Sequence, residues 1–113
     1  MKTMLISVLF FISALISYSQ NKILVYHETN QFRHGSINAG ISMFEDLGNE
    51  NTDWTTDNSQ DSSVFTATNL AQYDVVVFLN TSGNDESGSD GDLLSGSEKL
   101  ALENFIISGK GFI

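Results

Sequence analysis

Histidine and arginine side chains gather in one short stretch, ILVYHETNQFRHGSI, which spans residues 23–37. The chain has two His and one Arg, and Arg33 and His34 are neighbours in this stretch. Arginine can clamp a carboxylate or a sugar oxygen, and a neutral histidine can carry a proton or orient a hydroxyl. We therefore predict that Arg33 binds ligand oxygens and that His34 acts as an acid/base or orients a hydroxyl.

Simpler explanations exist for the same residues. His34 or Ser36 could cap a helix, and Arg33 could pair with one of the many acidic residues. His27 follows an apolar run, a position more typical of a surface or hydrogen-bonded structural residue. His27, His34 and Glu28 could be imagined as metal ligands, but their spacing fits no standard ligand motif, so we expect no metal.

Apolar runs predict the strands of an α/β sheet. The runs over residues 22–27 and 73–80 are continuous rather than alternating, as in strands that are covered on both faces. Thr and Trp over residues 51–57 predict a short further strand, and residues 111–113 predict the start of another. The polar residues 58–68 predict a loop with one helical turn.

Two helices are predicted between these strands. The first has apolar residues at i, i+4 and i+7: Ile37, Ile41 and Phe44. Gly48 is placed to end this helix. Ser95 and Glu98 fit a capping box at the start of the second helix, which we expect to end at Gly109.

This alternation of strands and helices is the order of a doubly wound parallel α/β sheet with helices on both faces. In such sheets, ligands bind outside the carboxyl ends of the strands, in the loops that lead into helices. The loop after the first strand (residues 27–36) and the loop after the central strand (residues 80–83) are of this kind. We expect them to converge on one crevice.

The first 20 residues, MKTMLISVLFFISALISYSQ, have the layout of a secretory signal peptide. Lys2 precedes an apolar run over residues 4–16 that is shorter than the ~20 residues needed to span a bilayer. A membrane anchor or a buried first helix is the alternative. We assign residues 1–20 to a signal peptide, so residues 21–113 are expected to be secreted or periplasmic, without a stable membrane anchor.

Composition excludes several kinds of function. The 14 Asp and Glu outnumber five Lys and Arg, and the formal charge of −9 opposes binding to nucleic acid or anionic lipid. The absence of Cys excludes disulfides, thiol nucleophiles and thiolate metal sites. No nucleotide-binding or serine-hydrolase motif follows a strand, so we expect no cofactor. An acidic cluster invites calcium, but its order does not fit an EF-hand: Asp85, Glu86, Asp90 and Asp92.

Three motifs occur in order along the chain: ILVYHETNQFRHGSI, NLAQYDVVVFLNTSG and ALENFIISGKGFI. Together they make residues 21–113 resemble the trehalose-utilisation, or ThuA-like, family. The resemblance implies a flavodoxin-like, class I glutamine amidotransferase-like α/β fold and a link to sugar metabolism. Two family motifs match by position: Phe-Arg-His at Phe32, Arg33 and His34, and Asn-Thr-Ser-Gly at Asn80, Thr81, Ser82 and Gly83.

In the family, the strand that starts with GKGFI runs on into a Gly-x-His-x-Ala turn, which lies beyond residue 113. We therefore expect residues 21–113 to be the N-terminal part of a ThuA-like domain. The resemblance implies an exported domain for utilisation of trehalose or another glycoside, within a sugar-processing enzyme that uses His34. A non-catalytic sugar-binding or accessory domain, or an inactive truncated fragment, is the alternative, so the sequence leaves enzyme activity open.

Overall fold

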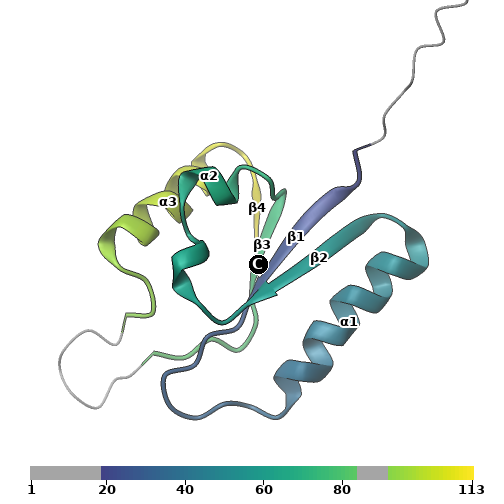
Figure 1. Ribbon diagram of the computed structural model, residues 1–113, viewed down its shortest axis with the longest axis horizontal. Helices are drawn as coiled ribbons and strands as arrows, with labels where there is room; N and C mark the ends of the chain where they lie inside the picture. Colours follow the sequence, from purple (N-terminus) through teal and green to yellow (C-terminus); the bar gives the residue numbers. More distant parts are fainter. Residues whose placement is uncertain (1–18, 84–91) are drawn as a thin grey trace, which may run out of the picture.

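Four parallel strands form the centre of the structure, a computed structural model that describes residues 19–83 and 92–113 (Figure 1). The strands are β1 (Asn21–Tyr26), β2 (Trp54–Ser59), β3 (Val75–Phe78) and β4 (Gly111–Phe112). Their order in the sheet is β2-β1-β3-β4, so the chain first moves to one side of β1 and then returns to the other. The predicted parallel α/β sheet is confirmed.

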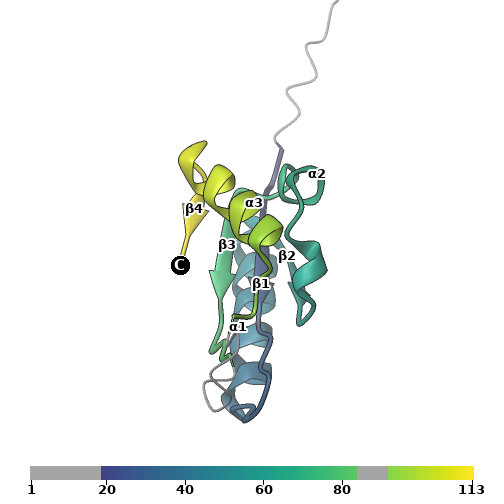
Figure 2. The ribbon, with the colours of Figure 1, turned by 90° about the vertical axis from the view of Figure 1, so that its left-hand side faces the viewer.

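Helices cover both faces of this sheet (Figures 1 and 2). The helix α1 (Ser36–Asn51) lies on one face, while α2 (Ala67–Leu70) and α3 (Gly96–Ile107) lie together on the other. A short 3-10 turn, η1 (Ser62–Val64), precedes α2. Among the described residues, no helix is long and apolar enough to cross a membrane. The predicted signal peptide falls mainly on residues 1–18, outside the described part of the chain.

Alternating side chains of β1 divide the core into two clusters. Leu24 and Tyr26 belong to the cluster under α2 and α3. Ile23 and Val25 belong to the cluster that packs against α1. All four side chains are buried, which explains why the apolar run of β1 is continuous: each face of the strand is covered by helices.

The end of α1 differs from the sequence prediction. Gly48 does not end the helix, which continues to Asn51 and is followed by Thr52 in the left-handed region, with a φ of 56°. A Cβ on Gly48 would lie 2.7 Å from the carbonyl oxygen of Trp54. Glycine at this position therefore lets α1 pack closely against β2, instead of providing a left-handed turn.

The second strand also differs, because β2 begins and ends later than the predicted range 51–57. Asn58 and Ser59, which the sequence assigned to a loop, pair in parallel register with Val25 and Tyr26. The strand lies at the edge of the described sheet, where polar side chains are tolerated on the solvent side. Pairing with β1 therefore extends β2 over Asn58 and Ser59, two residues whose own strand propensity is low.

The start of α3 agrees with the sequence prediction. Ser95 Oγ accepts a hydrogen bond from the Glu98 backbone N–H, and Glu98 Oε2 accepts one from the Ser95 N–H at 2.7 Å. The helix ends before Gly109, whose φ of 92° suits glycine. The strand β4 then begins at Gly111, as expected, while β3 is shorter than the predicted range 73–80.

Candidate functional site

The loops after β1 and β3 lie side by side at the carboxyl edge of the sheet. Thr29 and Ser82 form a parallel bridge between them. The Asn30 N–H donates to the Ser82 carbonyl oxygen at 3.0 Å, and the Ser82 N–H donates to the Glu28 carbonyl oxygen at 3.2 Å. After β1 the chain leads to α1 on one face, and after β3 it leads to α3 on the other. The two loops therefore meet at the point where the strand order reverses, the usual place of a ligand crevice in such sheets.

Arg33 is held by His27, the residue that follows β1. Arg33 Nη1 donates to the His27 carbonyl oxygen at 2.9 Å, and Nη2 lies 3.1 Å from His27 Nδ1. Because a guanidinium has only donors, Nδ1 is the acceptor and the proton of the neutral ring is on Nε2. That Nε2 donates to Asn58 Oδ1 on β2 at 3.1 Å. The guanidinium of Arg33 is thus oriented by two contacts to one residue.

The ion-pair alternative for Arg33 is wrong for the described residues. The ion pairs there join three lysines to aspartates: Lys22 to Asp57, Lys99 to Asp92 and Lys110 to Asp74. Arg33 instead contacts a neutral imidazole and a carbonyl oxygen. Its half-buried side chain brings a positive charge to the carboxyl edge of an otherwise acidic chain.

The capping alternative for His34 and Ser36 is also wrong. Gly35 occupies the N-cap position of α1, and no side chain caps this helix end. Ser36 Oγ instead accepts a hydrogen bond from Asn80 Nδ2 at 3.2 Å, which links the start of α1 to the loop after β3. Asn80 has a φ of 49°, a left-handed conformation that Asn adopts more readily than most residues.

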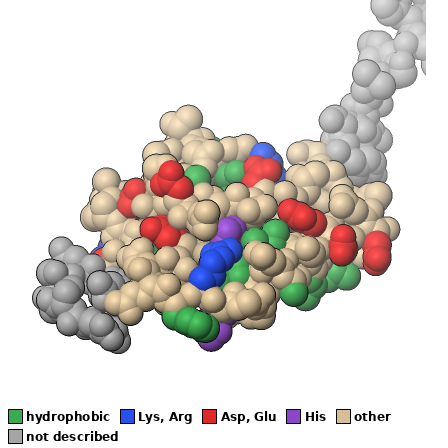
Figure 3. Space-filling view, turned by 60° about the horizontal axis from the view of Figure 1, so that its bottom comes forward, with side chains coloured by type: hydrophobic (Ala, Val, Ile, Leu, Met, Phe, Trp, Pro, Cys, Tyr) green, Lys and Arg blue, Asp and Glu red, His purple; other side chains and the backbone are tan. Residues whose placement is uncertain are grey.

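His34 and Phe32 form an exposed aromatic pair. Their ring centroids are 4.9 Å apart with an interplanar angle of 85°, and Phe32 is 69% exposed. Figure 3 turns this edge toward the viewer and shows Lys or Arg (blue) and His (purple) side chains close together there. An exposed apolar ring beside an imidazole offers both packing and polar contacts to a ligand.

Of the residues predicted in the second motif, Asn80 and Ser82 contact the loop after β1, through Ser36 and Asn30 respectively. Thr81 and Gly83 lie on either side of Ser82 and are half-buried. The structure therefore brings the two predicted motifs to one edge of the sheet.

Two further residues of this edge were not among the predicted site residues. His27 is 5% exposed, yet both its ring nitrogens have hydrogen-bond partners. Glu28 accepts a hydrogen bond from the phenol of the buried Tyr26. Burial, then the contact with Glu28, raises the pKa of Tyr26, so this phenol remains a donor. The only sequence signal for the contacts of His27 was its position directly after a continuous apolar run.

Outside this edge, the structure has an apolar hollow but no metal-binding cluster among the described residues. A hollow of 230 Å³ lies between α2 and α3, lined mainly by apolar side chains that include Leu70 and Phe105. No group of three or more His, Asp or Glu within residues 19–83 and 92–113 could hold a metal ion. The acidic cluster considered for calcium lies outside the described residues, except for Asp92, which pairs with Lys99.

Comparison with known proteins adds family information to this geometry. The sequence profile of a family described as ThuA, trehalose utilisation, matches residues 22–113. The crystal structure of a ThuA-like protein from Bacteroides uniformis ATCC 8492 matches with a TM-score of 0.60 and 22% sequence identity. The match covers 88% of this chain but only 38% of that chain, and at this identity it shows the fold alone. Among curated proteins, none matches this chain.

Proposed function

This chain belongs to the ThuA, or trehalose-utilisation, family, and on that premise we propose that its carboxyl edge binds a sugar or glycoside within an exported sugar-processing enzyme. One observation carries the proposal. At the carboxyl edge, where the loops after β1 and β3 meet, the half-buried Arg33 is held in a fixed orientation by His27. Fixed donors at such a position suit the hydroxyl and ring oxygens of a sugar.

The neighbouring residues supply the other contacts that a sugar requires. Phe32 offers an exposed ring against which the C–H groups of a pyranose can pack. Asn80, Thr81, Ser82 and Gly83 supply amide, hydroxyl and backbone groups from the loop after β3. His34 is exposed beside Phe32 and is the candidate acid/base.

A non-catalytic sugar-binding domain is the second candidate. The observation in its favour is that most of the residues proposed for this site can bind a ligand, whereas His34 is the single residue among them that is proposed to act as an acid/base. The chain also spans 38% of the length of the matched structure, so the activity of a whole protein is part of the proposal. Export is proposed from the signal-peptide layout of residues 1–20.

Arg33→Ala tests the binding site. The variant should weaken sugar binding about tenfold or more, because a hydrogen bond to a charged group contributes about 1.5–3 kcal/mol. Calorimetric titration with trehalose and a panel of methyl glycosides measures the change. Lys99→Ala is the matched control, since it removes an exposed cation on α3 and should leave the affinity unchanged. A wild-type chain that binds none of these sugars would contradict the proposal.

His34→Ala separates the two candidate functions. Because the side chain is exposed, the substitution should leave the melting temperature almost unchanged. For an enzyme, turnover of the bound glycoside by the full-length protein should be abolished. For a binding domain, the wild type should bind the sugar without forming product, and the variant should retain much of the affinity. An unaltered rate in His34→Ala would remove this residue from the mechanism.

A further inference from the structure

A hydrogen-bonded series of four side chains links α1 to the candidate site. Glu45 on α1 accepts a hydrogen bond from Asn58 Nδ2, Asn58 Oδ1 faces His27 Nε2, and His27 Nδ1 faces Arg33. The first of these contacts is the longest, at 3.4 Å, and the other two are 3.1 Å. These side chains connect α1, β2 and the loop after β1, which carries the predicted site.

The direction of every hydrogen bond in this series is fixed by its two ends. An ionised carboxylate only accepts, so the amide nitrogen of Asn58 faces Glu45 and the amide oxygen faces His27. A guanidinium only donates, so His27 Nδ1 accepts. Both ends therefore require the same state of the imidazole: neutral, with its proton on Nε2.

We propose that His27 is the positioning residue for Arg33, and that Glu45 and Asn58 hold its imidazole in the Nε2–H tautomer so that the guanidinium is pre-oriented for the ligand. The ligand-binding part of this inference rests on the proposed function. Pre-orientation reduces the loss of side-chain freedom on binding, which is large for an arginine. A carboxylate at position 27 would neutralise Arg33, whereas an imidazole positions it and leaves its charge available.

The composition of the chain makes the test direct. It has a single Arg and two His, so nitrogen NMR of the labelled full chain gives one Arg Nε signal and two imidazoles. His34→Gln assigns the imidazoles by removing one of them. For the wild type, we expect His27 to show a protonated Nε2 and an unprotonated Nδ1, and Arg33 Nε to be as ordered as the backbone. A proton on Nδ1 of His27 would overturn the proposal.

Variants test the dependence of Arg33 on His27. His27→Leu keeps a side chain of similar size in the buried site but removes the imidazole acceptor and leaves Arg33 only the backbone carbonyl contact, so the Arg33 Nε signal should become more mobile. His27→Gln can offer an amide oxygen and should restore part of the order. Asn58→Asp, which favours a charged imidazole with a proton on Nδ1, should mobilise Arg33 with the imidazole still present, and it replaces His27→Leu as the test if that variant does not fold. An Arg33 that stays ordered in His27→Leu, or in Asn58→Asp, would overturn the proposal.

Sugar binding provides the last readout. Arg33→Ala and His27→Leu should each weaken binding about tenfold, and the double variant should be no weaker than Arg33→Ala alone. Additive losses would show that His27 acts on the ligand independently of Arg33, and would overturn the positioning role. If no sugar binds to the wild type, the proposed function fails, and the NMR measurements still decide the inference.

Discussion

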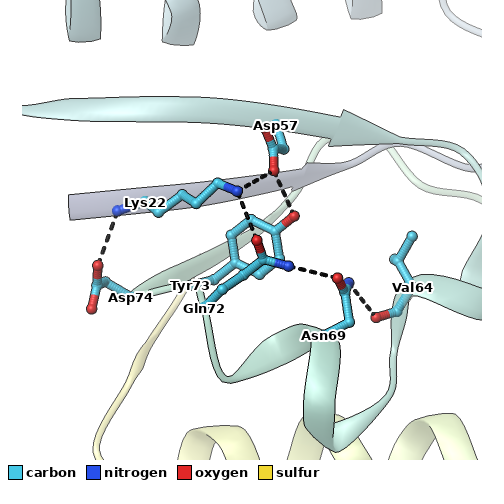
Figure 4. Close-up of polar contacts among 7 residues, drawn as sticks. All are labelled: Lys22, Asp57, Val64, Asn69, Gln72, Tyr73 and Asp74. Atoms are coloured by element: carbon cyan, nitrogen blue, oxygen red, sulfur yellow. Dashed lines mark hydrogen bonds and ion pairs between the residues drawn. The ribbon is translucent and has the colours of Figure 1, made fainter. Parts of the chain in front are cut away.

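At the amino edge of the sheet Lys22 and Lys110 pair with carboxylates, whereas at the carboxyl edge Arg33 is held by a neutral imidazole and a carbonyl oxygen. Figure 4 shows the amino edge, where Lys22 Nζ lies 2.8 Å from Asp57 Oδ2 and 2.7 Å from Gln72 Oε1. Tyr73 also donates to Asp57, at 2.7 Å. Each charge in this network has an opposite charge beside it.

The difference between the two edges teaches what each is suited to do. The polar network at the amino edge joins β1, β2 and the segment that precedes β3, and its charges are satisfied within the protein. Its members are Lys22, Asp57, Gln72, Tyr73 and Asp74. The carboxyl edge uses hydrogen bonds to fix the direction of Arg33 while its charge is not neutralised by a carboxylate within the described residues. We infer that the amino edge stabilises the fold and that the carboxyl edge is available to a ligand.

Asp57→Ala should destabilise the amino edge more than acid does. The change removes the acceptor of the buried Tyr73 phenol and the partner of Lys22, so the free energy of unfolding should fall by about 1–2 kcal/mol. Urea denaturation measures the loss. Asp57→Asn, which keeps an acceptor oxygen, is the control and should lose less. The sugar affinity should not change; a loss as large as that in Arg33→Ala would erase the distinction between the edges.

Low pH should also lower the free energy of unfolding through carboxylates of the same edge, but by a smaller amount. The hydrogen bond from Lys22 Nζ lowers the pKa of Asp57, and the Lys22 backbone N–H lowers the pKa of Asp74. A carboxyl whose pKa is lower in the folded state stabilises the fold above its unfolded pKa of about 4, and this contribution is lost as the pH falls through the folded value. Because both groups are partly exposed, each contributes only about 0.5 kcal/mol.

Thermal melts from neutral pH to about pH 3 test this dependence, in a range that spans the ordinary carboxyl pKa. Lys22→Met is the informative variant, because it removes the partner of Asp57 but keeps the backbone N–H that contacts Asp74. Its melting temperature should fall less steeply with acid than that of the wild type. Equal slopes would mean that the Lys22–Asp57 pair contributes nothing to the pH dependence.

The sequence was informative where the relevant contacts are local or follow from the topology. The capping box of Ser95 and Glu98 involves residues three positions apart, and the structure contains it. The meeting of the loops after β1 and β3 follows from parallel strands that lie side by side, since such strands end at the same edge. Both features could therefore be predicted before any contact was known.

The sequence was less informative where distant residues decide the local structure. Gly48 was interpreted as a helix end because the close approach of Trp54 is a tertiary contact. His27 was interpreted as a surface or hydrogen-bonded structural residue, and its hydrogen bonds confirm the second of these. Its partner Asn58 could not be predicted, because it lies 31 positions away on a strand that the sequence ended too early. An error of two residues in β2 was enough to hide the partner of the imidazole.

The most direct test of a ligand site at the carboxyl edge is an NMR titration of the labelled chain with trehalose and the methyl glycosides. We predict that the signals of Arg33 Nε, the His34 imidazole and the amides of residues 80–83 shift together and saturate, while those of Lys22, Asp57 and Tyr73 stay in place. Shifts confined to the amino edge or to the hollow between α2 and α3 would contradict the account, as would the absence of any shift.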